Sequence, residues 1–171
     1  MVVMRHLDTI ETECGFTMVE ALIAGAILTV SLMGLAGFQA VSLARNAESK
    51  EKTGVTNFGV EMVERIQSNR QRVLDYHNIN TAASTPCPQT TTAQRQALAD
   101  CQQWRTALTA SGINGVRGTV TAVRIDPDPT TGVPSLNRLD VVVTVTWNAS
   151  TAGGTSVQSK SATFRTVIAP E

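Results

Sequence analysis

One acidic residue in this sequence lies in an unusual setting. Glu20 stands at the edge of a long apolar segment: Phe16, Met18 and Val19 precede it, and residues 21–44 contain no charged side chain. A carboxylate at the edge of a membrane span is costly and needs a partner or a function. Two simpler explanations are that the side chain extends toward the membrane surface, or that the positive end of the helix dipole stabilises it.

Residue patterns that would support catalysis are missing from the sequence. It contains no Gly-x-Ser-x-Gly, no His-Glu-x-x-His, no Walker loop and no dinucleotide-binding fingerprint. Two histidines in 171 residues leave little room for a Ser-His or Cys-His pair. We therefore predict that the protein is not an enzyme and that it binds no cofactor.

The charge balance argues against some partners. Fourteen basic residues balance fourteen acidic ones, so the formal net charge is zero. A chain without a basic excess is not drawn as a whole to nucleic acid or to anionic lipid, and we predict that nucleic acid is not a partner. Charged residues make up 16% and hydrophobic residues 42% of the chain, which indicates that the apolar residues are concentrated in one part.

Residues 21–44 are the part in which they are concentrated. As a helix they would span about 36 Å, enough to cross a bilayer core of about 30 Å. A cleaved secretory signal peptide has a shorter apolar stretch with a small-residue cleavage site after it, so an uncleaved signal anchor fits better. The alternative is a buried core helix of a soluble protein, although such helices usually carry charge on one face.

The sequence around Glu20 resembles that of a known protein family. Residues 15–20, with the sequence GFTMVE, precede some twenty apolar residues. This pattern is similar to the class III signal of type IV pilins and of type II secretion pseudopilins. Residues 31–39, together with scattered stretches farther along the chain, are similar to PilV-type minor pilins. The resemblance implies the type IV pilin fold, which is an α+β fold in which a long N-terminal transmembrane and spine helix packs on a small antiparallel β-sheet.

The resemblance also implies roles for individual residues. Prepilin peptidase would cleave on the cytoplasmic side between Gly15 and Phe16, and Phe16 would then be N-methylated. Glu20 would face the N-terminal amine of a neighbouring subunit, which supplies the cation that a buried carboxylate needs. 

The implied organisation has three parts. Residues 1–15 would be a prepilin leader, and residues 16–44 the transmembrane half of the spine helix. Residues 45–171 would be a periplasmic pilin head, with the amphipathic half of the spine helix, a short helix and an antiparallel sheet.

The helices expected in this head follow from the apolar periodicity. Residues 46–76 contain no proline and carry one apolar stripe at helical spacing, which consists of Val55, Phe58, Met62, Ile66 and Val73. A loop is expected at residues 77–86. A second helix is expected to begin at a Thr91-x-x-Gln94 capping box and to stop at Gly112.

Strands are expected in the last third of the chain. Residues 118–125, 139–147 and 157–168 alternate between apolar and polar side chains or are rich in β-branched residues. Residues 148–156 contain two adjacent glycines and are interpreted as a hairpin connection. An antiparallel sheet on the apolar stripe of the long helix completes the expected α+β domain.

The three cysteines fall in two parts of the chain. Cys14 lies in the expected leader and would be removed with it. Cys87 and Cys101 remain in the part expected in the periplasm, where oxidising conditions allow a disulfide. Closing a loop of about 15 residues contributes about 3 kcal/mol in the chain-entropy account. The alternative is a pair of buried free thiols. Two cysteines cannot complete a zinc site, and we predict no metal site.

Two groups of charged residues have two interpretations each. Arg65, Arg70 and Arg72 could form a nucleic-acid patch, but ion pairs on a solvated helix face are the preferred interpretation. Asp126 and Asp128 could bind Ca²⁺, but the prolines between and after them favour a plain turn.

For function, the resemblance implies a minor pilin that helps to prime a type IV pilus and then joins it. The implied partners are other minor and major pilins, prepilin peptidase and the pilus assembly machinery of the bacterial inner membrane. The protein would be a single-pass inner-membrane protein that later enters the extracellular pilus. The alternatives are a type II secretion pseudopilin, a pilus-borne adhesin or DNA-binding subunit, and an anchored periplasmic domain that never polymerises.

Overall fold

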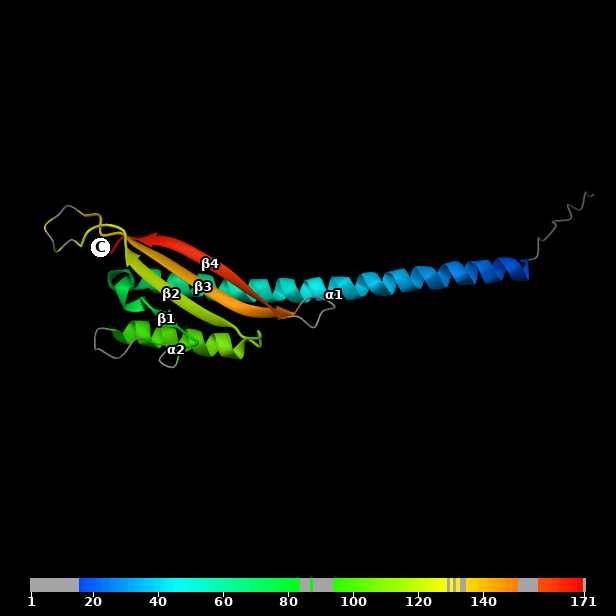
Figure 1. Cartoon of the computed structure of the whole chain (residues 1–171), viewed down its shortest axis with the longest axis horizontal. Helices are drawn as coiled ribbons and strands as arrows, with labels where there is room; N and C mark the ends of the chain where they lie inside the picture. Colours follow the sequence, from blue (N-terminus) through cyan, green and yellow to red (C-terminus); the bar gives the residue numbers. More distant parts are fainter. Residues whose placement is uncertain are drawn as a thin grey trace, which may run out of the picture. The chain divides into compact units, whose positions relative to one another are not determined.

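The structure is a computed structural model that describes residues 16–83, 87, 94–128, 130, 132, 135–150 and 157–170. In chain order, its elements are helix α1 (Met18–Ser68), 3₁₀ helix η1 (Arg70–Tyr76), strand β1 (Ile79–Asn80), helix α2 (Arg95–Ala110), and strands β2 (Arg117–Arg124), β3 (Leu139–Ser150) and β4 (Val157–Ile168) (Figure 1). Contacts within the chain divide it between Leu43 and Ala44. We call the part from Ala44 onward the head.

The head contains one antiparallel sheet with the strand order β1-β2-β3-β4. The register places Val120 opposite Val143, and Val143 opposite Phe164, so that alternate residues of the three long strands share one face. The side chains of β3 on this face are buried, namely Leu139, Val141, Val143, Val145, Trp147 and Ala149. The α+β class predicted from the sequence is therefore confirmed.

Both helices of the head pack on this buried face. Two glycines mark the closest approaches: a Cβ on Gly59 of α1 would lie 2.0 Å from the Phe164 ring, and one on Gly118 of β2 would lie 2.0 Å from the Trp104 indole of α2. The Trp104 indole N–H also donates to the Phe58 carbonyl of α1 (3.0 Å). These contacts build a two-layer domain whose core lies between the sheet and the helices (Figure 1).

Helix α1 ends earlier than its apolar stripe predicted. The last α-helical residue is Ser68, and Asn69 leaves the helical region with φ −110° and ψ 39°. The chain then continues as η1, in which Arg72 also has non-helical angles. The prediction of a helix as far as residue 76 is thus wrong, but Val73 and Tyr76 are still buried, so the stripe reaches the core through the 3₁₀ turn.

The sheet has one strand more than the sequence predicted. β1 lies in the segment interpreted as a loop, and pairs Ile79 with Val120 and Asn80 with Thr119. β2 is shifted by one residue toward the N-terminus relative to the predicted strand at residues 118–125. β3 continues through Asn148 to Ser150, so the prediction that the hairpin connection begins at residue 148 is wrong. β4 has the predicted bounds.

The second helix is present and ends as predicted. α2 runs to Ala110, and Gly112 follows with φ +72°, a left-handed conformation that glycine adopts at low cost. Gln94 is the N-cap residue and makes no side-chain cap hydrogen bond. Thr91, the other member of the predicted capping box, lies outside the described residues.

Candidate functional site

The N-terminal part of α1 presents an apolar surface that no other described residue covers. Every Phe, Met, Leu, Ile and Val side chain of residues 16–43 is at least 51% exposed. By length and composition, α1 is the one helix among the described residues that could cross a membrane. Apolar side chains on all sides of a helix call for a lipid or protein surrounding rather than water.

Glu20 lies in the first turn of this helix. The Thr17 hydroxyl accepts a hydrogen bond from the Glu20 backbone N–H (3.3 Å), and the Thr17 carbonyl accepts one from Ala21 (3.2 Å). Thr17 is therefore the N-cap, and Glu20 has the spacing of a capping box without the return hydrogen bond from its side chain. The Thr-x-x-Glu spacing is visible in the sequence and could have been used to predict this cap.

The Glu20 carboxylate makes no hydrogen bond or ion pair within residues 16–170 as far as the structure describes them. The carboxylate lies at the positive end of the helix dipole, one of the two simpler explanations for a carboxylate at this place. In an apolar surrounding the dipole does not replace a partner, because an ionised carboxylate there is costly unless a cation or hydrogen-bond donors lie beside it. Phe16 directly precedes the cap, and Gly15 lies outside the described residues.

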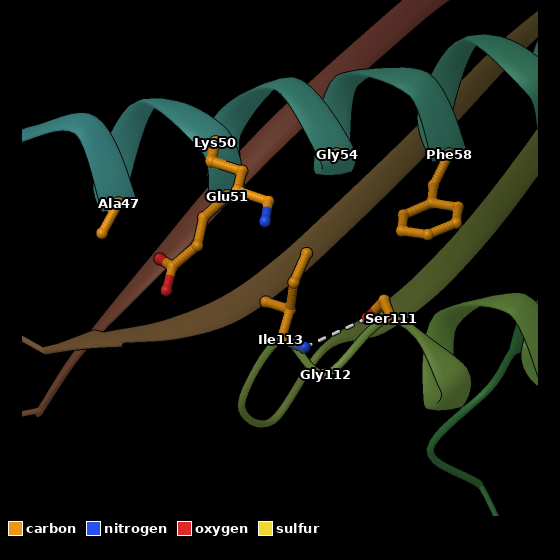
Figure 2. A pocket seen from close by; sticks show the side chains of 8 residues that line it. All are labelled: Ala47, Lys50, Glu51, Gly54, Phe58, Ser111, Gly112 and Ile113. Carbon is orange, nitrogen blue, oxygen red and sulfur yellow. Dashed lines mark hydrogen bonds between the residues drawn. The ribbon is translucent and has the colours of Figure 1, made fainter.

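A groove opens between the head part of α1 and the loop after α2 (Figure 2). Its volume is about 400 Å³, and its lining residues are Ala47, Lys50, Glu51, Gly54, Phe58, Ser111, Gly112 and Ile113. The Ser111 hydroxyl accepts a hydrogen bond from the Ile113 N–H (3.2 Å), which holds the loop in place. The groove was not predicted from the sequence.

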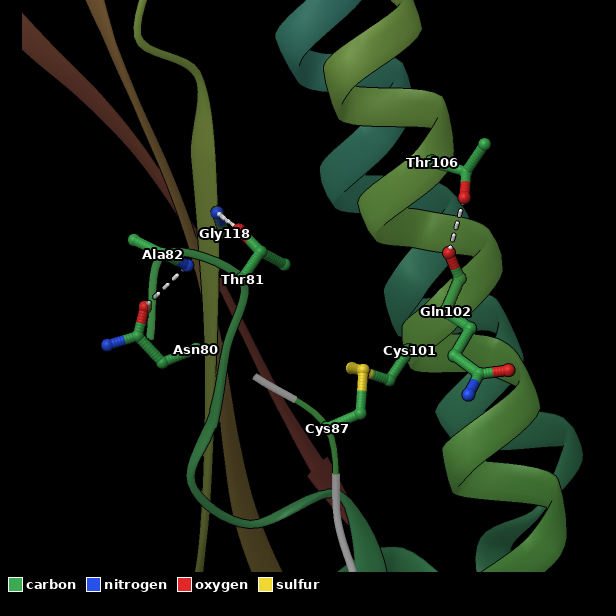
Figure 3. The surroundings of a disulfide bond; sticks show 8 residues. All are labelled: Asn80, Thr81, Ala82, Cys87, Cys101, Gln102, Thr106 and Gly118. Atoms are coloured by element: carbon green, nitrogen blue, oxygen red, sulfur yellow. Dashed lines mark hydrogen bonds between the residues drawn. A yellow bond between two sulfur atoms is a disulfide. The ribbon is translucent and has the colours of Figure 1, made fainter. Parts of the chain in front are cut away.

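Cys87 and Cys101 form a disulfide in the structure, with Cα atoms 5.6 Å apart (Figure 3). This agrees with the expected pairing. Cys101 lies on α2 and is fully buried, so the bond fastens Cys87 to this helix. The Thr81 hydroxyl accepts from the Gly118 N–H (2.8 Å) and ties the chain directly after β1 to β2.

A buried polar cluster joins α1, η1 and α2. The Asp100 carboxylate, in a residue that is 4% exposed, accepts hydrogen bonds from the Tyr76 hydroxyl (2.5 Å) and from Arg65 (3.1 Å). Burial, and then the hydrogen bond to Asp100, raise the pKa of Tyr76. Arg65 also donates to Glu61 and to Gln103. The cluster fastens α2 to α1 and η1, because its hydrogen bonds and ion pairs run between these three elements.

The contacts of Arg65 weaken the nucleic-acid interpretation of the three arginines. Its side chain is only 25% exposed. The ion pair with Glu61 on the same helix is of the expected kind, whereas the ion pair with Asp100 joins Arg65 to α2. Arg72 lies 3.9 Å from Asp75. A phosphate-binding patch needs basic groups that are free to reach the backbone of the nucleic acid. The guanidinium of Arg65 is not free in this way, because Glu61 and Asp100 bind it.

Asp126 and Asp128 form local contacts typical of a turn. Asp126 accepts from the Arg138 side chain and backbone, which lowers its pKa to about 2. Asp128 accepts from the Thr130 N–H (3.0 Å), as in an Asx-turn. Among the described residues, no group of three or more His, Cys, Asp or Glu side chains is arranged to hold a metal.

No protein-family model, curated protein or solved structure matches this chain.

Proposed function

We propose that this protein is a minor pilin of a type IV pilus, resembling the PilV type, and that it acts by association rather than by chemistry. The observation that carries the proposal is an uncovered apolar helix with a single carboxylate in its first turn, within the sequence GFTMVE. In this proposal, lipid or neighbouring helices surround the apolar helix and a cation lies beside Glu20. A neighbouring subunit with a free N-terminal amine would supply that cation.

In this proposal the chain is made as an inner-membrane precursor with a periplasmic head. Prepilin peptidase cuts between Gly15 and Phe16, Phe16 is N-methylated, and the apolar helix stays in the membrane. The helix then packs beside those of other minor and major pilins in the assembly machinery, with Gly25, Gly34 and Gly37 allowing close approach. In the structure a Cβ on any of these three glycines would meet no atom within 4 Å, so they leave space on the helix surface for a neighbour.

The head supports the proposal through its architecture. An α+β domain with a disulfide suits an extracytoplasmic compartment, because thiols stay reduced in the cytosol. A type II secretion pseudopilin would share the cleavage, the apolar helix and the carboxylate, and the identity of the neighbouring subunits would distinguish the two roles.

The role of Glu20 is tested by replacing it in cells that assemble pili. Glu20→Ala should leave the protein in the membrane but reduce its recovery in sheared pili, because the cationic amine of the neighbour loses its partner. Glu64→Ala, which removes an acidic side chain of the head part of α1, is the matched control and should leave recovery unchanged. Wild-type recovery of the Glu20 variant would contradict the proposed pairing.

A further inference from the structure

The groove beside Gly54 carries one positive and one negative side chain. Lys50 and Glu51 line it from α1, and both side chains extend from the side of the helix that faces the loop after α2 (Figure 2). Neither forms an ion pair or a hydrogen bond with another described residue. The groove therefore offers a ligand a cation and an anion that are neighbours in the chain.

The rest of the groove is mostly apolar. Phe58 lines it from α1 and Ile113 from the loop, and a Cβ on Gly54 would lie 3.5 Å from the Ile113 Cδ1 atom, so the absence of a side chain at Gly54 leaves space. The Ser111 hydroxyl donates to the Leu108 carbonyl (2.6 Å) and is thus already used as a donor. A suitable ligand has an anionic and a cationic group joined by a short carbon chain.

The place of the groove along α1 indicates the source of such a ligand. Lys50 and Glu51 follow six and seven residues after Ala44, the last residue of the uncharged apolar segment, in one unbroken helix. This separation is about 9–10 Å of helix, and the headgroup layer on each side of a bilayer core is about 5–7 Å thick. Helical side chains lean toward the helix N-terminus, and Figure 2 shows the Glu51 carboxylate directed toward Ala47. Both charged groups can therefore reach lipid headgroups.

We infer that the groove binds the headgroup of a zwitterionic phospholipid with a primary amine, phosphatidylethanolamine. Lys50 pairs with the lipid phosphate, and the Glu51 carboxylate accepts hydrogen bonds from the lipid ammonium. The two methylene groups between phosphate and ammonium lie against the apolar wall. The inference rests on the membrane location of the apolar helix in the proposed function, and adds a headgroup-specific anchor at the point where α1 enters the head.

Other common headgroups fit the two charges less well. An anionic phosphatidylglycerol would satisfy Lys50, but it has no cation for Glu51 and brings a second negative charge beside it. A phosphatidylcholine has both charges, but its quaternary ammonium has no N–H group to donate to the Glu51 carboxylate. The groove should therefore prefer the ethanolamine lipid over both.

Native mass spectrometry tests this preference. The full chain is released from nanodiscs that contain equal amounts of the ethanolamine, choline and glycerol phospholipids with identical acyl chains. We expect the retained lipid to be enriched in the ethanolamine lipid over the choline lipid by up to about fivefold, the effect of one exposed ion pair. Equal retention of the three headgroups, which indicates unspecific surrounding lipid, or a preference for the glycerol lipid would overturn the inference.

Variants connect the preference to the groove. Glu51→Gln should bring the ratio of ethanolamine to choline lipid close to one, and Gly54→Leu, which fills the groove without changing its charge, should do the same. The matched control is Glu64→Gln, an exposed acidic residue of α1 outside the groove, and should keep the wild-type ratio. If the Gly54→Leu head does not fold, Glu51→Gln decides, because it changes only a side chain without a partner in the described chain. A wild-type ratio in Glu51→Gln would overturn the inference.

Two further readouts separate the alternatives. Soluble phosphoethanolamine at millimolar concentration should not displace the lipid, because the bilayer keeps the effective concentration of the headgroup high. Displacement would show a site for a free ligand and contradict the lipid. Cleavage after Gly15 is measured in the same preparations. A cleaved chain without headgroup preference contradicts only this inference, and a chain with the preference that keeps residues 1–15 contradicts only the proposed pilin.

Discussion

The two parts of helix α1 differ in what surrounds their apolar side chains. Up to Leu43 the large apolar side chains point in all directions and are exposed, whereas after Ala44 Val55, Met62 and Ile66 are fully buried. The second part has one apolar stripe with period 3.6 and charged residues on its other faces, so the head itself can cover it. The first part has apolar side chains on all its faces, and none of the described residues covers them. The difference teaches that the same helix changes from a candidate membrane span to a core helix of the head near Ala44.

The largest effect is expected from opening the core of the head. Trp104→Ala removes a fully buried ring and its hydrogen bond to Phe58, and should destabilise the head by about 3–5 kcal/mol. Leu28→Ala removes an exposed apolar side chain from the first part of α1 and should leave head stability unchanged. The stability of the head in the two variants is compared by denaturant unfolding of the full chain in detergent, followed by near-UV circular dichroism. An equal loss of head stability in both variants would contradict the conclusion that only the second part of α1 belongs to the core of the head.

The disulfide should contribute the next largest effect. Cys87→Ser opens the loop between Cys87 and Cys101 and should cost about 3 kcal/mol of head stability. Reductant should lower the unfolding midpoint of the wild type to that of the variant and leave the variant itself unchanged. A midpoint of the wild type that reductant does not move would mean that the bond is not formed in the protein as purified.

Two glycines of α1 allow a smaller and more local comparison. Gly59→Ala would place a Cβ 2.0 Å from the Phe164 ring, and the displacement this requires should outweigh the gain in helix propensity, for a net loss of about 1 kcal/mol. Gly54→Ala meets only ordinary contacts and should stabilise the head by up to about 1 kcal/mol. Thermal unfolding of the two variants should shift in opposite directions, and shifts of the same sign would contradict the packing described for Gly59.

The smallest expected effect is a pH dependence from Asp126. Arg138 lowers the pKa of this carboxyl from 3.8 to about 2, so the folded state favours the charged form. The contribution to stability is present above pH 3.8 and is lost as the pH falls through about 2. Arg138→Gln should therefore reduce stability at pH 5 and have little effect near pH 2. A variant effect that does not change between these pH values would show that the pair has no electrostatic role.

Several elements could be predicted from the sequence because local patterns determine them. The pattern of residues 157–168 predicts the bounds of β4, and Ala162, Phe164 and Ile168 lie on the less exposed side of the strand. α2 ends before Gly112 because the chain needs a left-handed residue there. The apolar segment after Glu20 was visible from composition alone.

Other elements depend on contacts between distant residues, which local patterns do not reveal. β1 is only two residues long and exists because β2 pairs with it. The end of α1 at Ser68 was missed because apolar residues at suitable spacing continue into η1. The bond from Arg65 to Asp100 joins residues 35 positions apart, and the groove beside Gly54 forms only when the loop at Ile113 meets α1. Both therefore required the structure.

The most direct test of the proposed role is the N-terminus and intact mass of the protein taken from membranes, with and without prepilin peptidase. The proposal predicts a chain that begins at N-methylated Phe16 when the peptidase is present, and an uncut chain when it is absent. A chain that keeps residues 1–15 in both cases would contradict the proposal, and a membrane-anchored domain that does not polymerise would then explain the apolar helix.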